Sequence, residues 1–176
     1  YSDDGQARWE RINVASGSVR FAHVAENKVL EKPIRARAKF GPNGLQGKIV
    51  GNEQVGAVSD AIVAAPPAPQ SSVDIDSAGV FPVGPNVTLS MDEFLSGTML
   101  SDEQQRRQII YRETFAPQGG RVYPQRPTLF VWGESQSFGL TAPAGFDQAG
   151  STLFGIPLEI ERTLPRQPFT IPSPYH

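Results

Sequence analysis

The sequence predicts an α+β fold made mostly of short antiparallel β-strands, arranged as a sandwich or a barrel, with one or two short helices near residues 91–115. Three observations support this prediction. Several short segments alternate between apolar and polar residues, which is the two-residue period of a half-buried strand. The 176 residues include 17 glycines and 16 prolines, enough for many turns between short strands. Two sequences typical of capping boxes, at residues 90–93 and 101–104, predict closely spaced helix starts.

The first strands are predicted in the N-terminal third. Residues 18–24 alternate, and the pattern is clearest in residues 34–40, Ile-Arg-Ala-Arg-Ala-Lys-Phe, where apolar residues face one way and cations face the other. Residues 41–44, Gly-Pro-Asn-Gly, suit a tight turn, because proline restricts φ and both Asn and Gly tolerate positive φ. Residues 45–50 then return as the second strand of a hairpin, and a further apolar run covers residues 57–65.

A proline-rich segment follows at residues 65–72. Because proline has no N–H to donate to a sheet ladder, we predict a linker or crossing loop there. This divides the chain into a β-rich lobe that carries the basic hairpin, residues 1–64, and an α+β lobe, residues 73–176. The alternative is a single domain spanning residues 1–176, folded as one continuous sandwich.

The second lobe is predicted to begin extended, through residues 73–87, where Pro82 and Pro85 interrupt any long strand, and to continue with two helices. One helix spans residues 90–97, and a longer one spans residues 101–115. In the longer helix two acidic residues, at 102 and 103, each precede an arginine by four positions, which is the favourable order for ion pairs along a helix.

Short strands are predicted to complete this lobe. Residues 128–132 are apolar without alternation, which predicts a strand buried on both faces. Residues 137–141, 151–156 and 158–162 are shorter candidates, separated from one another by Gly and Pro.

Charge is segregated along the chain, although the formal net charge is only -2. Residues 1–48 contain nine cations and five acids, a net +4; residues 49–105 contain eight acids and no cation, a net -8; residues 106–176 contain seven arginines and five acids, a net +2. Such segregation produces oriented surface potentials that act on partners.

The candidate binding site is the basic face of the hairpin. It combines the outward cations of one strand with one residue before that strand and one on the returning strand: Lys32, Arg35, Arg37, Lys39 and Lys48. A cationic sheet surface suits phosphate, nucleic acid or an acidic glycan. This face lacks the aromatic residues on which single-stranded nucleic acids normally stack. The alternative interpretation is a solvated strand, or an edge strand charged against aggregation.

Metal and cofactor chemistry has few candidate residues. The chain has no cysteine, which excludes disulfides and thiolate metal sites. It has two histidines, His23 and His176, so a zinc site would have to consist mostly of carboxylates. Residues 74–79 match the start of a calcium loop, but Ala78 and Pro85 stand where that loop requires ligands. We therefore favour an Asp-rich turn and predict no metal-binding residues, no cofactor-binding residues and no cofactor.

Catalytic patterns are also incomplete. Residues 133–137 follow a predicted buried strand, as a nucleophile elbow does, but Ser137 stands where that motif requires glycine. We therefore predict no catalytic residues. A carboxylate pair assembled in space, for which Glu159 and Glu161 share one strand face, leaves a carboxylate-dependent hydrolase as an alternative.

The leading functional hypothesis is a non-enzymatic structural or interaction protein. It would be an extracytoplasmic domain or a subunit of a larger assembly such as a filament, an envelope or a virion, with copies meeting basic face to acidic face. The first alternative is a binding module for an acidic polymer, a glycan or a nucleic acid, through the basic hairpin.

Partners are expected to be proteins, in a homo- or hetero-assembly, with an acidic polymer as the second class. The sequence contains no run of ~18 apolar residues, so we predict no membrane span within this chain. Although the sequence does not determine location, we favour an extracytoplasmic or virion-associated one. The reasons are that the chain begins at Tyr1 rather than Met, as expected if a signal peptide or anchor was removed, and has no cysteine-based cytosolic chemistry.

Overall fold

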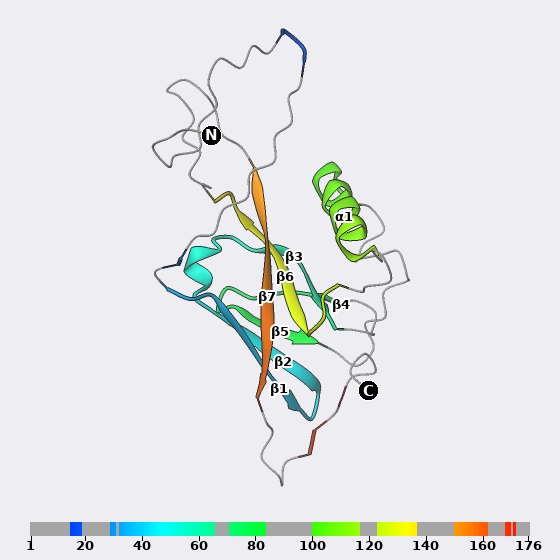
Figure 1. Ribbon diagram of the computed structural model, residues 1–176. Coiled ribbons are helices and arrows are strands. Elements are labelled where there is room, and N and C mark those ends of the chain that lie inside the picture. The colour runs from blue at the N-terminus through cyan, green and yellow to red at the C-terminus, as the bar shows by residue number, and fades with distance from the viewer. Residues whose placement is uncertain are drawn as a thin grey trace.

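The computed structural model describes residues 15–18, 29–30, 32–65, 71–83, 100–116, 123–136, 150–161, 168–169 and 171. In this part of the chain seven strands form one strongly curved sheet, and one α-helix packs on its outer side (Figure 1). The predicted class, mostly β with a short helix and barrel-like, is confirmed. The predicted strand at residues 18–24 and helix at residues 90–97 fall largely or wholly outside the described residues.

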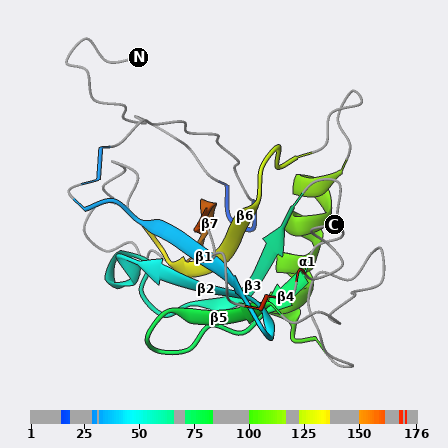
Figure 2. The same ribbon diagram turned by 90° about the horizontal axis from the view of Figure 1, so that it is seen from below.

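The sheet has the strand order β4-β3-β6-β7-β1-β2-β5. Its two end strands, β4 and β5, approach each other, so the sheet nearly closes into a barrel (Figure 2). All neighbouring strands are antiparallel except β1 and β7, which run parallel. The strands are β1 (Arg35–Gly41), β2 (Gly44–Val50), β3 (Ser59–Ala64), β4 (Ser71–Val73), β5 (Val80–Val83), β6 (Thr128–Glu134) and β7 (Ser151–Glu161), with a short 3-10 helix at Asn52–Gln54.

The predicted hairpin is confirmed as β1 and β2. Ala36 and Ala38 of β1 are buried and Phe40 is half-buried, whereas the cations that alternate with them are exposed. The tight turn between the strands is closed by Gly44, whose φ of 104° lies in the region that favours glycine. Local sequence therefore specifies both the hairpin and its basic outer face.

The predicted linker or crossing loop at residues 65–72 overlaps strand β4 at its C-terminal end. Ser71 and Ser72 belong to β4 and pair with β3, because they follow the prolines and keep their N–H donors. Residues 66–70 lie outside the described residues. Hydrogen-bonded ladders join strands from before and after this segment, as in the pairing of β3 with β6, and the division into two lobes stays a prediction.

The two strands predicted at residues 151–156 and 158–162 are a single strand, β7. Pro157 does not separate them, because it lies where β7 changes its partner. Pairing with β6 ends at Pro157, opposite Thr128, and pairing with β1 begins at Leu158, opposite Ala36. The N–H of Leu158 donates to the carbonyl of Pro127 at 2.9 Å, so hydrogen bonding continues past the proline.

Two apolar clusters hold the fold together. One fills the barrel, where Leu45, Ile49, Phe81 and Leu129 are almost completely buried. The other lies between the helix and the outer side of β3 and β6, and consists of Ile62, Ala64, Tyr111, Phe115, Phe130 and Trp132. Strand β6 is therefore buried on both faces, as its continuous apolar sequence predicts.

Helix α1 (Asp102–Phe115) begins as predicted. The Ser101 hydroxyl accepts a hydrogen bond from the backbone of Gln104, and the Gln104 side chain accepts one from the backbone of Ser101, which completes the capping box. Only Tyr111 and Phe115 of this helix are fully buried. The helix therefore also depends on polar contacts for its attachment to the sheet.

Those polar contacts centre on Arg107. Its guanidinium pairs with Asp60 of β3, and both side chains are only 12% exposed. It also pairs with Glu103 and donates to the Ser59 hydroxyl at 2.7 Å, while Gln104 donates to the second carboxylate oxygen of Asp60 at 3.0 Å. The four-residue spacing in the sequence predicts Glu103 as a partner within the helix, but it does not predict Asp60, which lies 47 residues away.

The phenol of Tyr111 completes the attachment by donating to the backbone carbonyl of Asp60 at 2.7 Å. Burial raises the pKa of Tyr111 above its ordinary value, the nearby Asp60 raises it further, and Arg107 opposes the rise. In the unfolded chain the same phenol ionises near pH 10. The folded state keeps the proton at higher pH, so this residue makes folding less favourable as the pH rises above about 10.

We therefore expect alkali to destabilise the wild-type protein more than Tyr111→Phe. The extra loss between pH 8 and pH 11 should be about 1.4 kcal/mol, which is the free energy of ionising a phenol one unit above its pKa of about 10 in the unfolded chain. Urea unfolding at the two pH values measures it. The matched control, Tyr123→Phe, removes a hydroxyl from a residue that is 51% exposed and should change stability at pH 8 by no more than about 0.5 kcal/mol. An equal loss in wild type and Tyr111→Phe would contradict the prediction.

Candidate functional site

The candidate site lies on the outer face of β1, β2 and β7. Alternate residues of β1 and β2 fill the barrel, so those between them point outward. The antiparallel register sets Arg37 opposite Lys48 and Lys39 opposite Gln46. Directly opposed side chains have Cβ atoms roughly 5 Å apart, so the hairpin gathers three cations within a short distance.

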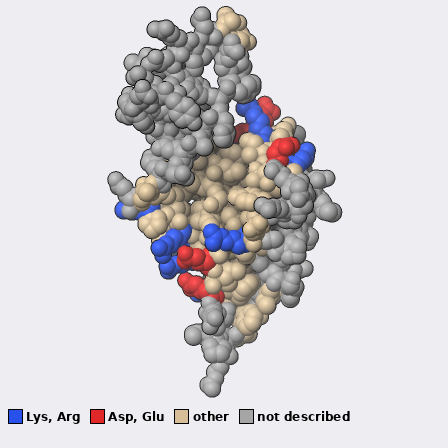
Figure 3. Space-filling model, in the orientation of Figure 1, with Lys and Arg blue, Asp and Glu red and all other residues tan. Residues whose placement is uncertain are grey.

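Strand β7 adds carboxylates that sequence analysis did not assign to this face. Its parallel pairing with β1 sets Glu159 beside Arg37 and Glu161 beside Lys39. Arg37 Nε lies 3.3 Å from Glu159 Oε2, and both side chains are about half exposed. Cations and acids consequently lie next to each other on the surface where β1 and β7 run (Figure 3).

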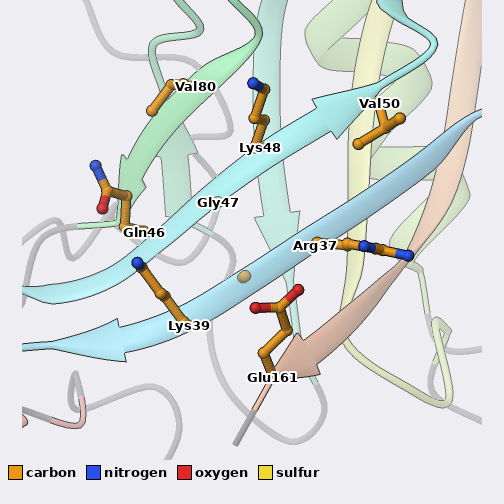
Figure 4. A pocket seen from close by; sticks show the side chains of 9 residues that line it. Arg37, Lys39, Gln46, Gly47, Lys48, Val50, Val80 and Glu161 are labelled. Carbon is orange, nitrogen blue, oxygen red and sulfur yellow. The ribbon is translucent and has the colours of Figure 1, made fainter. Parts of the chain in front are cut away.

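An open groove of about 400 Å³ runs over this face. Figure 4 shows the Glu161 carboxylate between the side chains of Lys39 and Arg37, with Lys48 on the side nearer Val80. The groove is lined by Arg37, Ala38, Lys39, Gln46, Gly47, Lys48, Val50, Val80 and Glu161.

Three of the five predicted site residues, Arg37, Lys39 and Lys48, line the groove. Arg35 lies on the same face of β1 but opposite Val50, outside the groove lining. Lys32 precedes the strand and pairs with Glu53 at 3.8 Å instead. The structure therefore assembles the central part of the predicted site.

Charge balance within the groove is uneven. Arg37 is engaged by Glu159, whereas Lys39 and Lys48 make no ion pair with any residue in the described part of the chain. Lys48 has a cation, Arg37, as its cross-strand neighbour on β1 and Val80 as its neighbour on β5. Like charges directly opposite each other in a sheet repel, so an external anionic group would be stabilised here.

Three carboxylates from the acidic middle of the chain have partners within the fold. Asp60, largely buried, pairs with Arg107, and Glu53 pairs with Lys32. Asp76 accepts backbone hydrogen bonds from Ala78 at 2.9 Å and Val80 at 2.8 Å, which makes residues 74–79 the Asp-rich turn that sequence analysis favoured. The carboxylates beside the basic face come from β7 instead.

Candidate residues for metal binding and catalysis are only partly described. Within the described ranges, no group of three His, Asp or Glu residues comes together as a metal site. His23, Ser137 and His176 lie outside the described residues. Of the two glutamates considered as a catalytic pair, Glu159 is engaged by Arg37 and Glu161 lines the groove.

Comparisons with known proteins supply no relative. No family model, no curated protein and no solved structure matches this chain. As for the membrane, helix α1 lacks the length and apolar character to cross a bilayer, and the described residues contain no other helix that has them.

Proposed function

We propose that this protein is a non-enzymatic interaction protein that binds its partner through the groove on β1, β2 and β7. One observation carries the proposal. Lys39 and Lys48 line an open groove of about 400 Å³, and neither is neutralised by an ion pair with another described residue. Anionic groups of a partner would relieve the repulsion between the clustered cations.

The lining also supports binding rather than catalysis. Apart from its cations, the groove offers an amide, one carboxylate and small apolar side chains. A hydrolase that uses two carboxylates needs both of them at one substrate bond. Here Glu161 lines the groove, whereas Glu159 holds Arg37 at 3.3 Å.

Binding of an acidic polymer through the same face is the second candidate. Lys39 and Lys48, which have no ion pair with a described residue, favour it, because repeated anionic groups would meet both lysines. Glu159 and Glu161 oppose it, since a continuous polyanion along β1 would pass beside both carboxylates. A partner that carries charges of both signs fits this face better, and the wider assembly, extracytoplasmic or virion-associated, stays a prediction.

Binding to an acidic polypeptide tests the proposal. Lys39→Glu/Lys48→Glu should weaken binding of poly-L-glutamate at low salt by about tenfold or more, because two attractive charges become repulsive. The control, Lys32→Glu/Arg112→Glu, changes net charge equally at exposed positions outside the groove lining and should bind nearly as well as wild type. Equal weakening in both variants would mean that only net charge matters. Absence of binding by wild type would refute the proposal that the groove binds anionic groups.

A further inference from the structure

We infer that the partner of this groove is a second copy of the same chain, docked face to face in a two-fold symmetric dimer. The inference rests on the proposed function and names its partner. The exposed charges of β1 and β7 carry it, because they form two adjacent stripes of opposite sign. Glu159 and Glu161 make up the acidic stripe on β7, and Arg37 and Lys39 make up the basic stripe on β1.

The parallel pairing of these strands gives the stripes the same direction and the same spacing. Glu159 lies in the row of Arg37, and Glu161 lies in the row of Lys39. A two-fold axis that runs between the two faces, parallel to the strands and along the boundary of β1 and β7, would bring β7 of one copy over β1 of the other. Glu159 of each copy would then face Arg37 of the other copy, and Glu161 would face Lys39, so each contact would be made twice.

Self-complementarity is what favours a second copy over another partner. A purely acidic partner would be attracted by the β1 stripe but opposed by the β7 stripe, and for a purely basic partner the reverse would hold. A second copy carries both stripes in the matching arrangement by symmetry. Lys39 and Glu161 share a row, and neither has an ion pair with a described residue, so both charges are open to a second copy.

The dimer is expected to be weak and strongly dependent on salt. Exposed ion pairs contribute little each, and four such pairs over a small sheet face do not make a permanent interface. The distance over which charges act, the Debye screening length, falls from about 30 Å at 0.01 M salt to about 3 Å at 1 M. We expect self-association at low salt to weaken about tenfold or more when salt is raised to about 0.5 M.

A charge swap tests the inference. Arg37→Glu/Lys39→Glu makes both stripes acidic, and Glu159→Lys/Glu161→Lys makes both basic. All four positions are exposed, so both variants should fold, which circular dichroism checks. In sedimentation at low salt, wild type should dimerise, each variant alone should stay monomeric, and an equimolar mixture of the variants should dimerise again.

Three outcomes would overturn the dimer: a wild type that stays monomeric at every concentration, a variant that self-associates as well as wild type, or a mixture that remains monomeric. The poly-L-glutamate experiment separates this failure from failure of the proposed function. If wild type is monomeric but binds the polymer through Lys39 and Lys48, the groove serves an acidic partner and only the dimer is refuted. If both experiments fail, the groove is not a binding surface.

Discussion

Replacing Arg107 by alanine should lower the free energy of unfolding by about 3 kcal/mol, because it leaves the largely buried Asp60 carboxylate without its charged partner. Both side chains are only 12% exposed, so water screens the lost pair poorly. The variant also loses the hydrogen bond to Ser59 and the contact of the guanidinium with the Trp132 ring, whose centroid lies 5.3 Å away.

Asp60 has little freedom to turn toward water after this substitution. It lies at an irregularity in the pairing of β3 with β6, and its φ of 46° is unusual for a residue other than glycine. The Tyr111 hydroxyl holds its carbonyl at 2.7 Å, and Gln104 holds one of its carboxylate oxygens at 3.0 Å. The backbone around Asp60 is therefore fixed by several contacts that do not involve Arg107.

Urea unfolding measures the loss. Arg106→Ala is the matched control, since it removes an exposed arginine from the same helix and should change stability by no more than about 0.5 kcal/mol. Adding Asp60→Asn to Arg107→Ala should recover part of the loss, because it removes the unpaired charge and asparagine tolerates positive φ. A loss below about 1 kcal/mol in Arg107→Ala would show that water reaches Asp60.

The second large effect is expected in the barrel, where Gly47→Ala should cost about 2 kcal/mol through overpacking. A Cβ at Gly47 would lie 2.1 Å from Cζ of Phe81 and 2.3 Å from its Cε2. Phe81 is completely buried and packs within the barrel core. Its ring therefore cannot move away without disturbing the surrounding core.

Thermal or urea unfolding of four variants tests this prediction: Gly47→Ala, Gly41→Ala, Phe81→Leu and the double variant Gly47→Ala/Phe81→Leu. Gly41→Ala, in the same hairpin, is the control, because the nearest atom to its Cβ would be 3.9 Å away and the change should stay within about 0.5 kcal/mol. In a Phe81→Leu background, Gly47→Ala should cost at least about 1 kcal/mol less than in wild type. The same cost in both backgrounds would mean that the ring is not what excludes a side chain.

Local patterns predicted the elements that depend on near neighbours. The alternation in residues 34–40 specifies one buried face and one basic face of β1, and the Gly-Pro-Asn-Gly turn sets the register of β2. The capping box at Ser101 specifies the start of α1. Each of these depends on contacts within a few residues, whose preferences can be read from the sequence.

Long-range pairing explains what was missed. Pro157 was expected to end a strand, but its missing N–H lies at the change of partner, which depends on where β6 and β1 meet β7. The Asp60–Arg107 ion pair was also not predicted, because no sequence spacing marks an acid in a strand and an arginine in a helix as partners.

For the candidate site, the sequence by itself determined that the side chains of Arg37, Lys39 and Lys48 point outward on one face of the hairpin, because the residues that alternate with them must be buried. Only the tertiary structure decided that Glu159 and Glu161 lie beside them. These residues are about 120 positions from β1 and reach it through a parallel ladder. Closing so long a loop depends on how the whole sheet packs, and no local pattern encodes it.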